Sequence, residues 1–264
     1  MNLLITGAAS GIGRAVANQF TDQGHTVYGI DLSNTEDREN FHGFVANITD
    51  AASLQAVKAH FVTNKIKLDA ILNVAGVHMM ASLVESDYSE MKKVIDVNLS
   101  GTMLVNRVFH ECLAEHGCIV IVTSEVASFD PMPFNGLYNV TKTALDAYAQ
   151  ALRQELNLIG QKVITIRPGA VETTLSSHSM KATQDLADAT VLYKKQAKNF
   201  ARLASKFMGT PIKPDVLASL IYKATTAKHP KPIYKKHRNI GLVLLNVLPK
   251  RLQCFVIKLL LNLL

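Results

Sequence analysis

The fold of this chain is decided close to its start, by Asn2-Leu3-Leu4-Ile5-Thr6-Gly7-Ala8-Ala9-Ser10-Gly11-Ile12-Gly13. The apolar beginning of this stretch predicts a strand, and residues 14–24 carry apolar side chains on one side of a predicted helix. A strand, a glycine turn and a helix in this order bring backbone N–H groups and a helix N-terminus together, where they can bind a pyrophosphate. No Gly-Lys-Ser or Gly-Lys-Thr follows the turn, which excludes a Walker-type phosphate loop.

A second predicted strand, residues 26–30, ends at Asp31, eighteen residues after Gly13. A carboxylate at this place can accept hydrogen bonds from the ribose hydroxyls of a dinucleotide. Because it would also repel a 2′-phosphate, we predict NAD as the cofactor. Arg14 leaves NADP as the alternative.

Length and composition agree with one α/β domain. The chain has 264 residues, of which 48% are hydrophobic and 19% are charged. This length suffices for one complete core, and this composition is that of a globular protein, not of a disordered one.

The segment Tyr138-Asn139-Val140-Thr141-Lys142 predicts a helix on which the phenol and the ammonium project from the same face. A free tyrosine has a pKa of about 10, and lowering it by about three units requires roughly 4 kcal/mol of differential stabilisation. We expect the ammonium to supply it, so that Tyr138 exchanges a proton with an alcohol or a carbonyl near pH 7. Alone, such a pair is also what an ordinary surface helix carries.

Residues 117–124 form an almost continuous apolar run, as expected of a strand in the buried centre of a parallel sheet. Ligands of such sheets bind beyond the carboxyl ends of the strands. Ser124 stands at this end, where its hydroxyl could stabilise a substrate oxygen, and a turn or helix cap is its alternative role. Thr123 is a poorer candidate for this role, because side chains alternate along a strand and its own would point away from the substrate.

Together these motifs resemble the short-chain dehydrogenase/reductase family in its compact form. The resemblance covers residues 1 to about 230 and implies a doubly wound parallel sheet, the Rossmann fold, over residues 1–238. It rests on Thr6-Gly7 with Gly11-Ile12-Gly13, Asn73-Val74-Ala75-Gly76, Asn98, Ser124, Tyr138 with Lys142, and Pro168-Gly169-Ala170-Val171-Glu172-Thr173.

The resemblance also implies a role for each matching residue. Tyr138 is the acid/base, Lys142 lowers its pKa and binds the nicotinamide ribose, and Ser124 stabilises the substrate oxygen. Asn98 distorts its helix and holds a water in contact with the lysine. No metal is implied, and the predicted cofactor-binding residues are Gly7, Ser10, Gly11, Ile12, Gly13, Asp31, Asn47, Ile48, Asn73, Ala75, Gly76, Tyr138, Lys142, Pro168, Val171 and Thr173.

The chain departs from the family pattern at a few positions. Asn47 stands where an aspartate usually meets the adenine amino group, and its carbonyl can accept the same hydrogen bond. Val74 replaces a second asparagine, and the loop between Ser124 and Tyr138 is one residue longer than usual. His78 is either a pocket residue or an ordinary loop histidine. The other predicted elements are strands at 43–46, 68–72, 162–167 and 232–234, and helices at 50–64, 88–115 and 214–228.

Two C-terminal segments lie partly or wholly outside the family pattern. Residues 174–213 carry apolar side chains at helical spacings and predict a helical lid over the substrate, with ordinary packing as the alternative. In the tail, residues 239–264, the sequence Pro249-Lys250-Arg251 and then Lys258 interrupt the apolar run, so we expect no bilayer crossing. One face of its second half is apolar, being made of Leu252, Phe255, Val256, Leu259, Leu260 and Leu263. Such an amphipathic helix lies in a membrane interface, or packs on its own domain or on a dimer mate.

Charge and cysteine usage limit the surroundings of the chain. The net charge of +7 favours an anionic membrane surface as a partner. Nucleic acid is disfavoured, because the basic residues are not interleaved with stacking aromatics. Cys112, Cys118 and Cys254 form no metal-ligand set with the histidines and are expected to be buried apolar residues in a reducing compartment. Because the apolar start is used as the first strand, we expect no secretory signal and a cytoplasmic or membrane-associated protein.

The sequence thus predicts an NAD(H)-dependent oxidoreductase for a hydrophobic secondary alcohol or ketone that works as a homo-dimer or homo-tetramer. The segment 133–138 resembles steroid and retinol dehydrogenases, which suggests a steroid, retinoid or lipid-like substrate. The alternatives are an NADPH-dependent carbonyl reductase and a non-catalytic dinucleotide sensor or scaffold. The complete set of Ser124, Tyr138, Lys142 and Asn98 favours catalysis.

Overall fold

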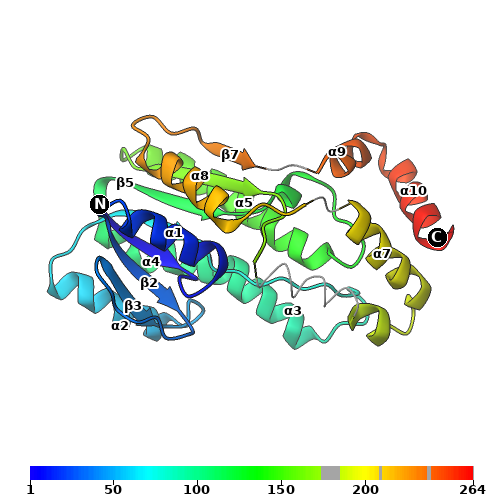
Figure 1. Cartoon of the computed structure of the whole chain (residues 1–264), viewed down its shortest axis with the longest axis horizontal. Helices are drawn as coiled ribbons and strands as arrows, with labels where there is room; N and C mark the ends of the chain where they lie inside the picture. Colours follow the sequence, from blue (N-terminus) through cyan, green and yellow to red (C-terminus); the bar gives the residue numbers. More distant parts are fainter. Residues whose placement is uncertain (174–184, 208–209, 237–238, 264) are drawn as a thin grey trace.

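The computed structural model in Figure 1 describes residues 1–173, 185–207, 210–236 and 239–263. Its centre is a seven-stranded sheet with the strand order β3-β2-β1-β4-β5-β6-β7, in which every pairing is parallel. The strands are β1 (Asn2–Thr6), β2 (Thr26–Asp31), β3 (Phe41–Val45), β4 (Leu68–Asn73), β5 (Leu113–Val122), β6 (Lys162–Pro168) and β7 (Ile233–Lys236). Because the strand order reverses between β1 and β4, the ligand-binding crevice of this doubly wound fold lies beyond the carboxyl ends of these two strands.

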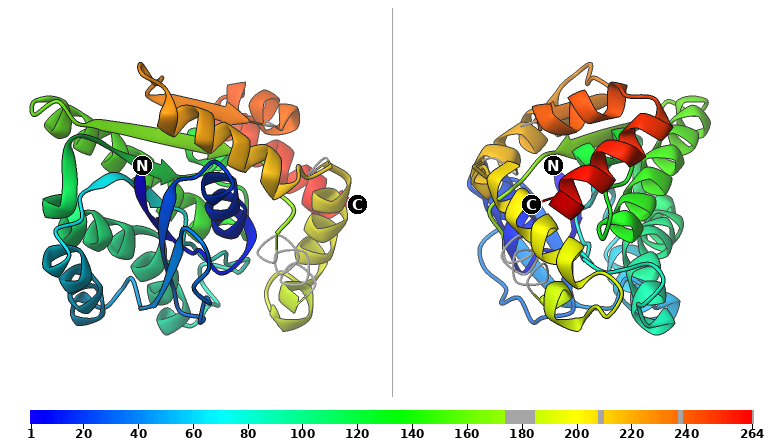
Figure 2. Two further views of the ribbon diagram at one scale, coloured as in Figure 1. Left: turned by 60° about the vertical axis from the view of Figure 1, so that its left-hand side comes forward. Right: turned by 90° about the vertical axis from the view of Figure 1, so that its right-hand side faces the viewer.

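Helices cover both faces of the sheet, which explains why the central strands are mostly apolar. On one face, α1 (Gly11–Thr21) and α8 (Pro214–Thr226) bury Phe20 and Ile221 (Figures 1 and 2). On the other face, α2 (Ala51–Thr63), α4 (Thr102–Phe109) and α5 (Gly136–Asn157) bury Phe61, Phe109 and Leu145. The predicted α/β fold is confirmed.

The segment 88–115, predicted as one long helix, is divided. It consists of α3 (Tyr88–Ile95), a π-helical segment (Asp96–Gly101), α4, a short 3-10 turn (His110–Cys112) and the beginning of β5. The prediction that the helix continues to residue 115 is wrong, because Leu113 is buried in the core and pairs with Leu68 of β4. The predicted distortion of the helix at Asn98 is confirmed, since this residue lies within the π-helical segment.

A smaller group of helices stands at one end of the molecule, on the right in Figure 1. It is made of α7 (Lys194–Phe207), α9 (Ile240–Val247) and α10 (Lys250–Leu263). Asn199 Nδ2 of α7 donates to Leu261 O of α10 at 3.0 Å, and both helices pack around Phe134 and Phe200. Helix α7 lies within the predicted lid, of which residues 174–184 and 208–209 fall outside the described residues.

The tail, predicted as an amphipathic helix, forms two helices that are separated at Pro249. No helix in the described part of the chain is long and apolar enough to cross a membrane. Cys112 and Cys118 are buried as expected, whereas Cys254 is exposed on α10, so the prediction of a buried side chain is wrong for this cysteine.

Candidate active site

The turn between β1 and α1 accepts only glycine at its critical positions. Gly7 and Gly11 have φ angles of +73° and +51°, which L side chains rarely adopt. At Gly13, a Cβ atom would lie 2.0 Å from the carbonyl oxygen of Gly7. The missing side chains leave a cradle of bare backbone at the N-terminus of α1.

This cradle has free binding capacity for an anion. Ser10 is the N-cap residue of α1, but its side chain makes no capping hydrogen bond. The first N–H groups of a helix have no partner within the helix and carry the positive end of its dipole. The residues present therefore fit a pyrophosphate group.

The adjacent ends of β1 and β4 are held together by Thr6. Its hydroxyl accepts hydrogen bonds from Val74 N at 3.1 Å and Ala75 N at 3.2 Å. A Cβ atom on Gly7 would lie 2.9 Å from Ala75 Cα, so the two backbones meet in close contact. Ala75 thus borders the cradle, and its predicted contact with the cofactor stays a prediction.

Asp31 is positioned for a ribose at the end of β2. Its Oδ2 atom accepts from Ala9 N at 3.0 Å, and its Oδ1 atom accepts from Ser33 N at 3.0 Å. These bonds hold the carboxylate against the glycine turn and leave further lone pairs for sugar hydroxyls.

Asn47 and Ile48 are less open to a ligand. Asn47 Oδ1 accepts from both the backbone N and the hydroxyl of Thr49, at 3.0 and 2.9 Å, so its two lone pairs are already used. Ile48 is buried and packs close to Gly101. Their contact with adenine stays a prediction, and for Asn47 it requires that the Thr49 hydroxyl turn away.

Ser124, Tyr138 and Lys142 meet just beyond the carboxyl end of β5. Tyr138 and Lys142 lie on the first turns of α5, and Lys142 Nζ is 5.7 Å from the centre of the phenol ring. Lys142 Nζ also donates to Val122 O at 3.2 Å. Ser124 caps the short helical turn Glu125–Ser128 and makes a side-chain hydrogen bond with Tyr138. Ser124 is therefore a helix cap that also contacts Tyr138, and its action on a substrate oxygen stays a prediction.

Burial dominates the charge states of the pair. It raises the pKa of Tyr138 to about 12, against the opposing hydrogen bond from Ser124, and lowers the pKa of Lys142 to about 8. The expectation that Lys142 pulls the pKa of Tyr138 toward 7 is not met, because desolvation disfavours the charged form of both groups. At neutral pH Tyr138 is therefore a protonated phenol.

Asn98 acts as a clamp beside this pair. Its amide donates to Val77 O at 2.9 Å and to Thr141 Oγ1 at 3.1 Å, and its oxygen accepts from Val77 N at 2.8 Å. These bonds join the loop after β4 to α5. A Cβ atom on Gly76 would lie 3.2 Å from Asn98 Oδ1 and 3.5 Å from Lys142 Nζ, so Gly76 leaves the space between them open. The water-holding role of Asn98 stays a prediction.

Asn73, the last residue of β4, lies buried next to the site and is bonded to α4. Its Nδ2 atom donates to Asn106 Oδ1 at 2.8 Å, while its Oδ1 atom is buried without a hydrogen-bond partner among the described residues. A buried acceptor without a hydrogen-bond partner lowers the stability of the fold, so Asn73 Oδ1 is a candidate acceptor for a ligand. Contact of Asn73 with the cofactor stays a prediction.

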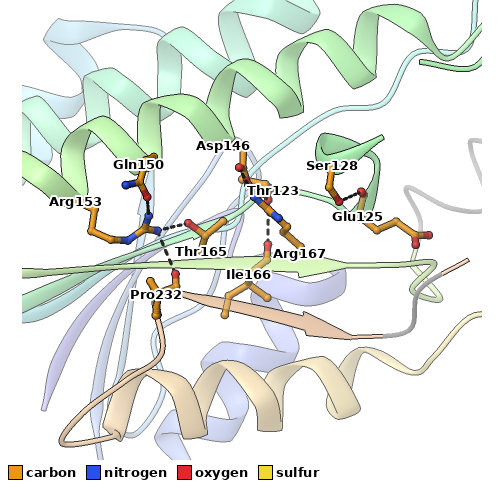
Figure 3. A network of polar contacts seen from close by, with 10 residues as sticks. All are labelled: Thr123, Glu125, Ser128, Asp146, Gln150, Arg153, Thr165, Ile166, Arg167 and Pro232. Carbon is orange, nitrogen blue, oxygen red and sulfur yellow. Dashed lines mark hydrogen bonds and ion pairs between the residues drawn. The ribbon is translucent and has the colours of Figure 1, made fainter. Parts of the chain in front are cut away.

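A polar network fastens α5 to the sheet, as Figure 3 shows. Arg167 of β6 makes two bonds to Asp146 of α5, at 2.8 and 2.5 Å. Thr123 Oγ1 donates to Asp146 Oδ1 at 3.4 Å and to Ile166 O at 3.3 Å, so its hydroxyl is directed toward α5 and β6, although Thr123 also lines the cavity beside Ser124. Arg153 bonds Val163 O, Thr165 and Pro232 O. The helix that carries Tyr138 is thereby fixed relative to the end of β5.

The loop after β6 passes over the glycine turn. Beyond Pro168, the last residue of β6, Val171 is buried and forms a parallel bridge with Ile212. The methyl group of Thr173 lies 3.3 Å from the place of a Cβ atom on Gly11. This loop therefore lies where it could contact a ligand in the cradle, and its predicted contact with the nicotinamide half stays a prediction.

A cavity of about 440 Å³ extends from the glycine turn past the predicted catalytic residues to the tail. Ile12 and Thr173 line one part of it, and Ser124, Tyr138 and Lys142 line its middle. The far wall is apolar and consists of Met80, Met132, Phe200, Leu203, Leu242, Leu245, Ile257, Leu260 and Leu261.

Sequence reasoning missed two parts of this cavity. The tail was not predicted to line it, although both tail helices carry a second apolar face that could have indicated this. His78, left undecided, lines the cavity with its ring 4.5 Å from that of Tyr138 and its Nε2 atom 2.9 Å from Asn135 Oδ1. Burial lowers the pKa of His78, so its imidazole is neutral near pH 7.

Comparison with known proteins agrees with this geometry. A reductase from Schizosaccharomyces pombe, named NADPH-dependent 1-acyldihydroxyacetone phosphate reductase, is 32% identical over 193 residues, which are 70% of this chain and 64% of the relative. A 3-ketodihydrosphingosine reductase from Bacteroides thetaiotaomicron is 24% identical over 86% of this chain and 84% of its own.

Solved structures share the fold. A short-chain dehydrogenase family protein from Francisella tularensis superposes with a TM-score of 0.75 at 22% identity, over 89% of this chain and 96% of that one. A 3-ketoacyl-(acyl-carrier-protein) reductase from Brucella melitensis, complexed with NADH, gives 0.72 at 24% identity, over 89% and 95%. The family model described as short chain dehydrogenase matches residues 1–184. With the cradle, the Ser124, Tyr138 and Lys142 site and this match together, the chain belongs to the short-chain dehydrogenase family, whose members are oxidoreductases that bind NAD or NADP.

Proposed function

We propose that this protein reduces the carbonyl group of a hydrophobic ketone to an alcohol, and that it uses NADH. The observation that carries the proposal is the position of Ser124, Tyr138 and Lys142 in the middle of one cavity, between the dinucleotide cradle and an apolar wall. A ligand that spans this cavity has its reacting atoms at these side chains and its hydrocarbon part against the wall.

The protonation state of Tyr138 favours the reductive direction. The reduced nicotinamide supplies hydride to the carbonyl carbon, and the chain must supply a proton to the oxygen. A phenol with a pKa of about 12 carries this proton at neutral pH and is the general acid in the proposal. The Ser124 hydroxyl donates a hydrogen bond to the same oxygen, where negative charge develops.

Lys142 and Asn98 keep this acid in place. Lys142 lies beneath the ring of Tyr138 and, with its pKa near 8, is largely protonated at pH 7. Its charge stabilises the phenolate that remains after proton transfer. Asn98 joins Val77 to Thr141, one residue before Lys142, and so fixes the register of the two segments that enclose the site.

The substrate class follows from the far wall of the cavity. The described residues of this wall have aliphatic, aromatic and methionine side chains, and none of them is a carboxylate or an arginine that could bind a charged substrate. Elsewhere in the cavity lining that the structure describes, the acidic residue is Glu125, whose Oε2 atom accepts a hydrogen bond from Asn239 N at 2.7 Å. Two relatives are named for reduction of acylated or sphingoid ketones, which supports a substrate with a hydrocarbon chain. Another relative, from Rhizobium radiobacter, is named serine 3-dehydrogenase, so the names alone do not decide the substrate.

The proposed preference for NADH rests on Asp31. Its carboxylate is fixed beside Ala9 of the glycine turn, where a 2′-phosphate would meet a negative charge. The alternative, NADPH, is favoured by the printed name of the Schizosaccharomyces pombe relative.

The test is a panel of 3-keto and 2-keto compounds with short and long hydrocarbon chains, each assayed with NADH and with NADPH by absorbance of the reduced nicotinamide. The proposal predicts turnover that increases with chain length and is faster with NADH. Absence of turnover with all ketones, together with tight NADH binding, would favour a dinucleotide sensor instead. Faster turnover with NADPH would overturn only the cofactor assignment.

A further inference from the structure

The excess of positive over negative charge in this protein comes from its C-terminal part. Residues 216–264 contain nine lysines and arginines and no aspartate or glutamate. The preceding 215 residues contain nineteen basic and twenty-one acidic residues, so they are almost neutral. The net charge of +7 therefore originates in the segment that includes both tail helices.

Each tail helix has two apolar faces. The inner faces line the cavity with Leu242 and Leu245 of α9 and Ile257 and Leu261 of α10. The outer faces are open to solvent, and Val247 and Phe255 are 78% and 60% exposed there. The exposed apolar residues of the outer faces follow helical spacing and are Ile240, Leu244 and Val247 on α9 and Leu252, Phe255, Leu259 and Leu263 on α10. Leu260 is also exposed, but it lines the cavity.

The basic residues of α10 border its outer apolar face. With about 100° between successive residues, Arg251 and Lys258 fall beside the row formed by Leu252, Phe255 and Leu259, on the side away from the cavity. Both are exposed. This is the arrangement of a helix that lies in a membrane interface, where apolar side chains enter the acyl region and long basic side chains reach the headgroups.

The tail helices are fixed to the loop that follows Ser124. Asn239 N donates to Glu125 Oε2 at 2.7 Å, and Asp130 N donates to Asn246 Oδ1 at 2.8 Å. The Asp130 carboxylate accepts from Gln253 Nε2 at 3.2 Å and forms an ion pair with Lys250. The same two helices therefore separate the outer apolar surface from the substrate cavity, and these hydrogen bonds attach them to the loop beside the active site.

A second copy of the chain is a poor match for this surface. In a symmetric dimer the same patch faces itself, which would bring Arg251 and Lys258 of one copy close to the same residues of the other, with no acidic residue on either tail. A surface of anionic lipid headgroups instead attracts each nearby lysine or arginine with about 1 kcal/mol. Charge and apolar exposure therefore favour a bilayer.

We propose that the outer face of α9 and α10 docks on a lipid bilayer that contains anionic headgroups. Resting on the proposed function, the inference extends to the substrate: a hydrophobic ketone enters the cavity from the bilayer beneath these two helices. The docking surface consists of Ile240, Leu244, Val247, Leu252, Phe255, Leu259 and Leu263 together with Arg251 and Lys258.

The experiment is flotation of the full chain with vesicles of phosphatidylcholine alone and of phosphatidylcholine with phosphatidylserine. We expect flotation with the mixed vesicles, and weakening by salt. The double variant Arg251→Gln and Lys258→Gln should bind roughly 30-fold more weakly, from about 1 kcal/mol per charge. The double variant Val247→Glu and Phe255→Glu, which leaves the cavity lining intact, should not float.

The matched control for the charges is the double variant Lys65→Gln and Lys93→Gln, and the control for an exposed apolar side chain outside the tail is Leu158→Glu. Both variants should float like the unmodified protein. Tyr138→Phe should also float normally, which separates docking from catalysis. The docking proposal fails if the unmodified protein does not float with mixed vesicles, or if the Val247→Glu and Phe255→Glu variant floats equally well. It also fails if light scattering shows that this variant converts a dimer to a monomer while neither protein floats, since the face then binds a second copy.

Discussion

Replacing Gly7 and Gly24 with alanine, one at a time, separates two contributions to the free energy of unfolding. One is the cost of a left-handed backbone conformation, and the other is the cost of a close contact made by the new Cβ atom. The two glycines have almost identical φ angles, +73° and +74°. An alanine in this left-handed conformation costs roughly 1–2 kcal/mol. The two positions differ in their surroundings, because a Cβ atom on Gly24 would meet nothing within 4 Å, whereas one on Gly7 would lie 2.9 Å from Ala75 Cα and 3.1 Å from Ala75 N.

The contact at Gly7 sets the size of the additional effect. Carbon atoms prefer separations of about 3.5–4.0 Å, so Ala75 must move by roughly half an ångström or more. Overpacking of this kind costs about 1–3 kcal/mol. We therefore expect Gly24→Ala to lower the free energy of unfolding by about 1–2 kcal/mol and Gly7→Ala to lower it by about 2–5 kcal/mol.

The two variants should also differ in cofactor binding. Ala75 N bonds to Thr6, so a shift of Ala75 disturbs the turn that forms the phosphate cradle. NADH affinity, measured by fluorescence titration, should fall about tenfold or more in Gly7→Ala, which is ~1.4 kcal/mol, and stay unchanged in Gly24→Ala. Urea unfolding gives the stabilities. Equal losses of stability in both variants, or unchanged NADH affinity of Gly7→Ala, would refute the reasoning.

Asp31→Ala should lower the ratio of kcat/KM with NADH to kcat/KM with NADPH about tenfold or more. If this ratio is unchanged, Asp31 does not determine which of the two cofactors is preferred. Burial lowers the pKa of Lys142 from its ordinary 10.5 to about 8, so between these values the unfolded chain binds more protons and stability rises with pH. Lys142→Met should thus be more stable than the unmodified protein by about 3 kcal/mol at pH 7, and this difference should shrink toward pH 10.5. Urea unfolding at several pH values measures it, and a difference that does not change with pH would contradict the prediction. Asp130→Ala removes a partner of buried Gln253 and should cost about 1–2 kcal/mol of stability. It should also raise KM for long-chain ketones more than for short ones, and equal changes for both would argue against the tail as a cavity wall.

The layered fold could be predicted because its signals are local. The apolar runs of β1, β2 and β5 lie between two helix layers, and the glycine turn after β1 follows directly from the spacing of Gly7, Gly11 and Gly13. The early start of β5 could not be predicted. Leu113 joins the sheet by pairing with Leu68, forty-five residues earlier, and such a contact leaves no local signal.

The site could be predicted as far as its motifs extend. Tyr138 and Lys142 meet because they are one helical turn apart, and Ser124 joins them because β5 ends beside α5. The pKa of Tyr138 was not predictable, since it depends on how much protein surrounds the phenol. The same holds for the cavity wall formed by α9 and α10, which requires knowledge of how the tail returns to the loop at Glu125 and Asp130.

The central claim is that the hydroxyl of Tyr138 gives its proton to the substrate oxygen. Its most direct test is Tyr138→Phe, with turnover of the best ketone and the dissociation constant of NADH measured on the same preparation. The variant keeps the ring that packs against His78 and lacks only the hydroxyl. We predict loss of turnover by a factor of about 100 or more with NADH affinity unchanged. Turnover close to that of the unmodified protein would contradict the account.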